Sequence, residues 1–412
     1  MAIPFFSIDL SKKDYFNLII NLINPLSKKK LLKKLKDMIS TRYPNKYITI
    51  LPSGRLGFYL CMKFLFKPND LVIFSSMSFP LYIKIAKQLN LRVKLIDVSK
   101  SDLNINTELL NNINDNCKGI VVTHLFGNPC EVKKIQQICK ERKILLIEDC
   151  AQSFDSKFDG IETGNFGEAG IISTSLLKIP TTLSGGILVT KNKKLHEQAD
   201  KWILENLDNN FKKKIKLFIK IFLFILNSYP KIYSILSDKV FSFLKNFNPR
   251  IYRKILYSGM GMKNKIYDPK ERPNISKFQL AVGISQIERC EIMTEKRRNN
   301  SKYLQNKLKN LENIKVINDH FKKEWNHQYF VIYIKKNFHK IVDQIFKNGI
   351  HAMDENVWNC LNYDFKIENY KDTFDVTEKF DGSLLRLQNN SFLTKREIDK
   401  IANIIIKACN EN

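Results

Sequence analysis

The chain has 412 residues, of which 44% are hydrophobic, so it can bury a large core and is not a low-complexity disordered chain. Its formal net charge is +27 at pH 7. Because lysine, asparagine and isoleucine are all abundant and no recognised nucleic-acid motif is present, we expect no nucleic-acid partner. Eight scattered cysteines without a C-x-x-C pair, and a start without a secretory pattern, predict a cytoplasmic protein with reduced thiols.

The first 48 residues are expected to form a basic amphipathic arm. Its central stretch, SKKKLLKKLKDMIS, places leucine, methionine and isoleucine among lysines at helical spacing. We therefore separate residues 1–48 from the domain that follows.

Residues 49–202 are expected to form a large α/β domain with a mostly parallel sheet flanked by helices. The β-branched runs DLVIFSS, LRVKLIDV, GIVVTHLF and KILLIED alternate with segments of helical spacing. In EVKKIQQICKER, for example, Val132, Ile135 and Cys139 share one helical face. This alternation is typical of βαβ units, whose ligands bind at the carboxyl ends of the strands.

Residues 203–272 are expected to be a basic, apolar helical insertion. Positions 211–254 hold 11 Lys or Arg residues and a single acid. The apolar run Ile221 to Leu226 is far shorter than the roughly 20 residues that span a bilayer, and Pro230 is expected to end the first helix. Two interpretations stay open: helices lying in a membrane interface with lysines on anionic headgroups, or an insertion packed on the protein or a dimer partner.

Residues 273–412 are expected to form a smaller C-terminal α/β domain. The stretch SKFQLAVGISQIERCEIM has helical spacing, and NHQYFVIYI ends in a short β-branched and aromatic run.

The turn Ser53-Gly54-Arg55 is the first candidate for chemistry, because it opens the apolar segment LGFYLCMKFLF. A small polar turn at the start of a helix offers backbone N–H groups and the positive end of the helix dipole, which suits a phosphate. An ordinary turn before a helix is the alternative.

Asp149 follows the strand KILLIE in the motif DCAQ. A carboxylate at a buried strand end is costly unless a cation pairs with it, and a protonated pyridine nitrogen would be such a cation. A simple turn aspartate would also explain the position.

Lys178 lies in ISTSLLKIPTTLSGG, between the strand-like runs AGIIS and GGILVT. An isolated lysine here would be read as a surface charge. A lysine amine can also form an imine with a carbonyl, which is how pyridoxal phosphate enzymes hold their cofactor. A phosphate turn, a strand-end carboxylate and an amine 29 residues later are the three anchors that this cofactor needs.

These motifs resemble the DegT/DnrJ/EryC1/StrS family of pyridoxal phosphate sugar aminotransferases, which have the fold type I of aspartate aminotransferase. The resemblance covers residues 50–200 and 273–405. Its most specific pieces are VVTHLFGNPCEVKKIQQICKERKILLIEDCAQSF and FDGIETGNFGEAGIISTSLLKIPTTLSGGILVT. The segments SKFQLAVGISQIER and SLLRLQNNSFLTKREIDKIA resemble the helix and closing segment of the small domain.

The resemblance implies roles for particular residues. Lys178 would bind pyridoxal 5'-phosphate covalently and move a proton, Asp149 would keep the ring nitrogen protonated, and Gln152 would lie beside the ring's phenolic oxygen. Phe79 would stack on the ring. The implied phosphate ligands are Ser53, Gly54, Arg55 and Ser173. His124, in HLFG, is read as a hydrogen-bonded strand-end histidine, and no metal ligand is expected because no histidine has metal-ligand spacing.

The chain departs from the family pattern at several positions. Arg55 stands where the family has threonine, Ser184 replaces an acid, and Ile172 and Thr174 replace aromatics. The family's N-x-R-M element, which reaches the neighbour's cofactor in the dimer, is here RPNI at 272–275, so Asn274 or Arg272 would take that role.

The resemblance implies a homodimeric aminotransferase with shared active sites. An amino acid donor such as glutamate would load the cofactor, and a keto sugar, nucleotide-linked by expectation, would receive the amine in polysaccharide or glycoconjugate biosynthesis. Related dehydratases replace the lysine with histidine, so Lys178 favours transamination. Two alternatives stay open: a membrane-surface binding protein without turnover, and a related enzyme acting on a lipid-linked keto substrate.

Overall fold

The structure is a computed structural model of the chain. It describes residues 3, 8–23, 27–113, 116–208, 210–228, 232–247, 266–317, 324–353, 358–365, 367 and 373–412.

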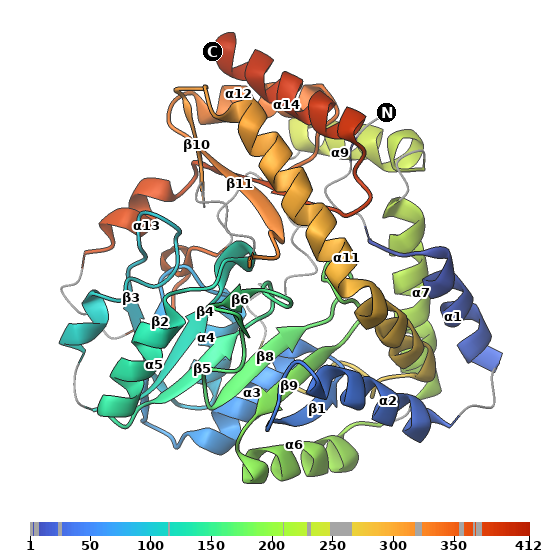
Figure 1. Cartoon of the computed structure of the whole chain (residues 1–412), viewed down its shortest axis with the longest axis vertical. Coiled ribbons are helices and arrows are strands. Elements are labelled where there is room, and N and C mark those ends of the chain that lie inside the picture. The colour runs from blue at the N-terminus through green and yellow to red at the C-terminus, as the bar shows by residue number, and fades with distance from the viewer. Residues whose placement is uncertain are drawn as a thin grey trace.

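A seven-stranded sheet in the order β1-β9-β8-β5-β4-β2-β3 forms the centre of the large domain (Figure 1). Strands β2, β3, β4, β5 and β8 are parallel, whereas β9 is antiparallel to both β1 and β8. The predicted mostly parallel sheet is therefore confirmed. The bounds are β1 Tyr47–Leu51, β2 Leu71–Ser75, β3 Arg92–Ile96, β4 Cys117–Thr123, β5 Leu145–Asp149, β8 Ala169–Ser173 and β9 Gly186–Thr190.

Helices cover both faces of this sheet, because successive residues of a strand point to opposite sides. Val72 and Phe74 of β2 belong to the core shared with α3, α4 and α6, whereas Leu71 and Ile73 belong to the core shared with α5. On the half of the sheet formed by β1, β9 and β8, the layer opposite α3 consists of α2 and α11. These helices are α2 Lys28–Ser40, α3 Gly54–Leu65, α4 Pro80–Gln88, α5 Val132–Glu141, α6 Lys193–Asn206 and α11 Lys277–Leu308.

The C-terminal part is a second, smaller α/β unit. Its antiparallel sheet β10-β11-β12 packs against α12 and α14 in one core. The 32-residue helix α11 joins the two units, since its first half packs on the large sheet and its end, at Leu304 and Leu308, enters the C-terminal core (Figure 1). The bounds are β10 Ile314–Val316, β11 Tyr329–Ile334, β12 Leu384–Gln388, α12 Phe338–Lys347, α13 Asp375–Phe380 and α14 Lys395–Asn410.

The first helix of the insertion, α7 (Phe211–Ser228), lies along α1 (Lys12–Ile23) and α11 (Figure 1). Its residues Ile221 and Ile225 are buried in a core with Leu183, which belongs to the Lys178 loop. One face of the insertion therefore packs on the protein itself. A π-helical turn, η3 (Tyr233–Ser237), and α9 (Asp238–Phe247) follow. Pro230 lies outside the described residues, although α7 ends at Ser228, as the prediction of a break requires.

None of the helices in the described part of the chain combines the length and the hydropathy needed to cross a bilayer.

Candidate active site

The ends of several strands meet at one edge of the sheet. Thr123 of β4 is in register with Asp149 of β5, and Ser173 of β8 with Gly186 of β9. Leu51, the last residue of β1, pairs with Gly186 from the other side. This edge therefore gathers the phosphate turn, the carboxylate and the lysine loop that the sequence analysis took from separate segments.

Asp149 is buried, and no cationic side chain of the described residues contacts it. Its Oδ1 accepts the N–H of Ala151 at 3.0 Å, and its Oδ2 accepts the hydroxyl of Thr123 at 3.3 Å. Burial raises the pKa of Asp149 to about 6, against the opposing effects of these hydrogen bonds and of the nearby Lys178 charge. Such a carboxylate gains from a cation brought into contact, which fits a protonated pyridine nitrogen.

Lys178 is half-buried in the loop between β8 and β9. Its Nζ lies 5.7 Å from the centre of the Tyr329 ring and close enough to Asp149 for their charges to interact. The carbonyl of the preceding Leu177 accepts a hydrogen bond from Gln328 Nε2 at 2.9 Å. The loop is therefore fixed by the segment that leads into β11, and the amine points to the site edge.

The phosphate turn is closely packed against the glycine pair. Ser53 is the N-cap of α3, and its Oγ accepts the N–H of Leu56 at 3.2 Å. A Cβ added at Gly186 would lie 2.3 Å from the backbone N of Gly54, so only glycine fits at the start of β9. A Cβ at Gly54 would lie 3.4 Å from Ser173. Ser173 therefore lies beside the turn, as a shared phosphate site requires.

Gln152 and Phe79 also lie on loops that follow parallel strands. The Oε1 of Gln152 accepts the N–H of Phe126 at 3.1 Å, which fixes the orientation of its buried amide. Phe79 is half-buried at the start of α4, and its ring packs against Tyr82 and Trp358. No described contact joins the Phe79 ring to Asp149 or Lys178, so its stacking role stays a prediction.

His124 has a structural role, since its side chain is held in a hydrogen bond with Glu148. Its Nδ1 accepts the N–H of Cys130 at 3.2 Å, so its Nε2 carries the proton and donates to Glu148 at 3.1 Å. The Glu148 carboxylate also accepts the N–H groups of Gly164, Phe166 and Gly167. The side chains of His124, Glu148 and Cys150 lie within 4.8 Å of one another. These hydrogen bonds already occupy the imidazole and the carboxylate, and the group serves as a buried support.

The RPNI element lies beside the phosphate turn of its own chain. Arg55 Nη2 contacts Glu271 Oε1 at 2.9 Å, and Arg272 Nε approaches the same oxygen at 3.6 Å. Arg272 also donates a hydrogen bond to the hydroxyl of Ser184. Asn274 Oδ1 accepts the N–H of the next residue at 2.8 Å. No partner chain is present, so a contribution of Asn274 to a neighbouring site stays a prediction.

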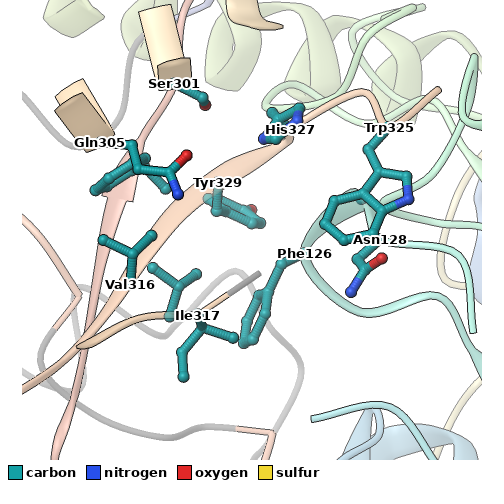
Figure 2. Close-up of a pocket in the computed structure, with 12 residues that line it drawn as sticks. Phe126, Asn128, Ser301, Gln305, Val316, Ile317, Trp325, His327 and Tyr329 are labelled. Carbon is teal, nitrogen blue, oxygen red and sulfur yellow. The ribbon is translucent and has the colours of Figure 1, made fainter. Parts of the chain in front are cut away.

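A narrow cavity of about 10 Å³ lies beside the site, between the Phe126 loop and β11 (Figure 2). Figure 2 shows the Tyr329 ring in the middle of the view, with His327, Trp325 and Phe126 around it. Because the cavity is about as large as one water molecule, it cannot hold a sugar. It marks the junction between the two units of the chain.

Sequence reasoning missed the residues that lead into β11. Asn326 Nδ2 donates to the backbone carbonyls of Gln152 and Phe154 at 2.9 and 2.7 Å. Gln328 holds the Lys178 loop, and the buried Arg297 donates to its Oε1 at 3.1 Å. The available signal was the polar triplet NHQ directly before the strand YFVIYI.

This arrangement fits pyridoxal 5'-phosphate. Asp149 would face the ring nitrogen, Lys178 would bind the aldehyde carbon, and the turn at Ser53 with Ser173 would hold the phosphate. The fit rests on the raised pKa of the buried carboxylate and on the glycine-lined turn.

Comparisons with known proteins place this chain and its fold in one group. The sequence matches the DegT/DnrJ/EryC1/StrS aminotransferase family over residues 31–218 and 251–406. GDP-4-keto-6-deoxy-D-mannose 3-dehydratase of Escherichia coli O55:H7 is 24% identical over 91% of both chains. GDP-perosamine synthase of Escherichia coli O157:H7 is 26% identical over 46% of this chain, and the match spans about half (52%) of that relative. PseC of Helicobacter pylori, an aminotransferase involved in the biosynthesis of pseudoaminic acid, superposes with a TM-score of 0.77 and 16% identity over 100% of both chains.

The fold and the site thus define a pyridoxal phosphate enzyme of fold type I. The chain belongs to the DegT/DnrJ/EryC1/StrS aminotransferase family. Its cofactor is pyridoxal 5'-phosphate, and the family resemblance stated from the sequence is confirmed.

Proposed function

We propose that the protein transfers an amino group from an amino acid, glutamate by expectation, to a keto sugar. The observation that carries the proposal is the Lys178 amine beside the buried Asp149 carboxylate at the sheet edge. When bound, the cofactor supplies an electron sink for the carbon that gains or loses the amine. Lys178 Nζ takes and returns the proton at that carbon, and Asp149 holds the proton on the ring nitrogen.

The proposed acceptor is a keto sugar carried by a nucleotide, used in polysaccharide or glycoconjugate biosynthesis. Support comes from the substrates in the relatives' names, which include GDP-perosamine synthase and a UDP-linked sugar transaminase of Helicobacter pylori, 32% identical over 100 residues. Dehydratases are also among the relatives. Lys178 favours transamination over dehydration, because a lysine rather than a histidine is available for the proton transfer.

Borohydride reduction of the purified holoenzyme, followed by peptide mapping, tests the role of Lys178. We expect the pyridoxyl group on the peptide containing SLLK, and no labelled peptide from Lys178→Ala. Lys191→Ala is the matched control, because Lys191 lies at the end of β9 with its side chain 59% exposed. Labelling of another lysine in the wild-type protein would contradict the assignment.

Turnover is tested by the glutamate-dependent release of 2-oxoglutarate with a panel of nucleotide-linked and lipid-linked keto sugars. Release with a nucleotide-linked sugar supports the proposal, and release only with a lipid-linked sugar changes the carrier. Bound cofactor without release from any donor would favour a binding protein that has lost turnover.

We propose a homodimer in which Asn274 reaches the cofactor of the neighbouring chain, as the resemblance implies. If so, Lys178→Ala chains mixed with Asn274→Ala chains should recover activity, because one of the two sites in each mixed dimer is intact. Single-variant samples refolded alone are the controls. Mixed dimers without activity would contradict a shared site.

We also propose that the insertion binds an anionic membrane surface at the cytoplasmic face. Four apolar side chains at helical spacing are exposed on α7, namely Ile215, Ile219, Phe222 and Leu223. Val240, Phe243 and Phe247 are exposed on α9, and Phe16 and Ile19 on the neighbouring α1. The exposed groups on α7 and α1 together are called the apolar face below.

The charge around the apolar face favours an anionic membrane over a second copy of the chain as its binding partner. Lys212, Lys213, Lys216 and Lys220 are exposed on α7, and the helix contains no acidic residue. Exposed apolar side chains beside lysines suit the boundary between acyl chains and anionic headgroups. A second copy of the same basic helix would bring like charges together, so a self-contact is disfavoured.

Flotation with vesicles of phosphatidylglycerol and phosphatidylcholine tests the membrane contact. The wild-type holoenzyme should float with the mixed vesicles, less with phosphatidylcholine alone, and the triple variant Ile215→Ser, Ile219→Ser, Phe222→Ser should not float. Leu204→Ser is the control, because Leu204 is 80% exposed on α6, outside the apolar face. Unchanged flotation of the triple variant would exclude this face. If the wild-type protein does not float, and the triple variant is a monomer where the wild type is a dimer, the apolar face contacts a second copy of the chain instead.

A further inference from the structure

The N-terminus of α3 is surrounded by more positive charge than its acids neutralise. Among the residues that the structure describes, Arg55 and Arg272 share one carboxylate, that of Glu271. Lys220 of α7 is near enough to both guanidinium groups for their charges to lower its pKa, after the larger effect of its partial burial. Three cations around one carboxylate leave two positive charges, which is the charge that a phosphate dianion neutralises near neutral pH.

A buried tyrosine hydroxyl lies at the same turn. Tyr267 is 5% exposed, and its hydroxyl is close enough to the Ser53 side chain for this contact to oppose the rise in its pKa that burial causes, although no described residue meets it with full hydrogen-bond geometry. Its backbone is fixed on both sides, because Gln88 Oε1 accepts its N–H and Gln88 Nε2 donates to its carbonyl, each at 3.0 Å. A buried hydroxyl that is held beside the turn without a well-formed hydrogen bond can donate to a ligand with acceptor oxygens.

Arg272 is held toward the turn in a similar way. It donates to the Ser184 hydroxyl, and Gln279 donates to the carbonyl of the same serine. Burial, followed by the nearby Arg55 charge, lowers the pKa of Arg272 to about 10. Two guanidinium groups held this close gain from an anion that contacts both.

We propose that the insertion completes the phosphate site of the cofactor within its own chain, with Arg272 and Tyr267 joining Arg55 as phosphate ligands. The inference rests on the assignment of pyridoxal phosphate as the cofactor. The resemblance implies that a threonine at the turn and a residue from the neighbouring chain surround the cofactor's phosphate. In this protein, two arginines and a tyrosine of the same chain lie around that position. Lys220 adds charge at the rim, and Asn274 stays the candidate for the contribution across the dimer.

Cofactor binding to the cofactor-stripped full-length protein tests the proposal without using activity. The dissociation constants of pyridoxal phosphate and of pyridoxal, which lacks the phosphate, are measured from the absorbance of the lysine-bound form. We expect Arg272→Met to weaken pyridoxal phosphate binding by about ten- to a hundred-fold, the range for a lost charge-assisted hydrogen bond, and Tyr267→Phe by about three- to ten-fold. The affinity for pyridoxal should change less than about two-fold in both variants, since it has no phosphate to lose.

Three controls decide how the result is read. Arg272→Lys should recover most of the lost affinity if charge is what binds, and Lys212→Met, an exposed lysine of the same insertion, should bind both compounds like the wild type. Inorganic phosphate should slow the uptake of pyridoxal phosphate by the wild type but not by Arg272→Met. Equal losses of pyridoxal and pyridoxal phosphate affinity would overturn the proposal and show a packing role.

The source of the phosphate and the chain that binds it are tested separately. An unchanged pyridoxal phosphate affinity in Arg272→Met, with a raised KM for a diphosphate-linked sugar, would overturn the proposal in favour of a substrate site. In mixed dimers of Lys178→Ala with Arg272→Met chains, the only lysine that can bind cofactor belongs to the Arg272→Met chain. A weakened pyridoxal phosphate affinity of the mixed dimers supports a phosphate site formed within one chain. An affinity equal to that of the wild type would overturn the proposal. Absence of covalent cofactor in the wild-type protein would instead contradict the assignment of the cofactor.

Discussion

Two neighbouring carboxylates at the end of β5 face opposite sides of the sheet and meet opposite environments. Glu148 is buried among three backbone N–H groups and the His124 ring, so its charge is fully paired. Asp149 is also buried but accepts one N–H and one hydroxyl from the described part of the chain, and its pKa is raised to about 6. The Glu148 carboxylate therefore stabilises the fold, whereas the Asp149 carboxylate on the other side of the sheet is suited to bind a cationic ligand.

The difference shows how a site can be recognised by what is missing. A buried carboxylate with a complete set of donors has nothing to gain from a ligand, whereas one without them does. The same argument separates Tyr267, whose hydroxyl meets no described residue with full hydrogen-bond geometry, from the satisfied hydroxyls of the Lys178 loop, such as Thr174 and Thr182, which bond each other at 2.7 Å.

The largest expected effect is the loss of stability in Glu148→Ala. Removing the carboxylate leaves three N–H groups and the His124 donor buried without an acceptor, so the free energy of unfolding should fall by about 3–5 kcal/mol. Urea denaturation of the cofactor-free protein measures it. Glu141→Ala, an exposed change on α5, is the control and should differ by less than about 0.5 kcal/mol. Equal stability of both variants would mean that the Glu148 network is not structural.

Asp149→Asn should do the reverse, with a large loss of activity and a stable fold. An amide cannot hold the proton of the ring nitrogen, so we expect the transamination rate to fall on the order of a hundred-fold, equivalent to about 2.7 kcal/mol. Single-turnover reaction with glutamate measures it, with bound cofactor quantified in the same sample. A rate near that of the wild type would make Asp149 an ordinary turn residue.

The pH dependence of stability gives a third comparison. The folded pKa of Asp149 lies above the ordinary value of 3.8, so its contribution to stability is fully present below about pH 4 and is lost as the pH rises through about 6. Cofactor-free Asp149→Asn lacks this loss and should exceed the wild type by up to about 3 kcal/mol above pH 6, with the difference vanishing below pH 4. Thermal melts from pH 4 to 8 measure it. A difference that is independent of pH would contradict the raised pKa.

The smallest expected effect comes from Thr123→Val. This change removes the 3.3 Å hydrogen bond to Asp149 and the 3.0 Å bond to Ser78, while keeping the side-chain shape. The Asp149 pKa should rise further, which moves the pH transition of the melts upward, and stability at pH 7 should fall by about 1 kcal/mol. A downward movement of that transition would show that Thr123 does not favour the ionised form.

The sequence by itself determined the elements whose signal is local. The β-branched runs became β2, β3, β4 and β5, and the apolar face of EVKKIQQICKER became the buried face of α5, because periodicity is set by backbone geometry within a few residues. The candidate residues Ser53, Asp149 and Lys178 were found from strand ends and turns, and the parallel order of the sheet brought their segments to one edge. The residue types at strand ends can be read from the sequence, and their proximity in space follows from the order of parallel strands in the sheet.

Only the tertiary structure decided which distant residues complete the site. Asn326 and Gln328 reach the Gln152 and Lys178 loops across more than 150 positions, and Arg272 reaches Ser184 across 88. The insertion was predicted as helical, but periodicity could not tell which apolar residues of α7 pack on Leu183 and which stay exposed. Such contacts depend on how whole elements dock, and a polar side chain has no local pattern that names its partner.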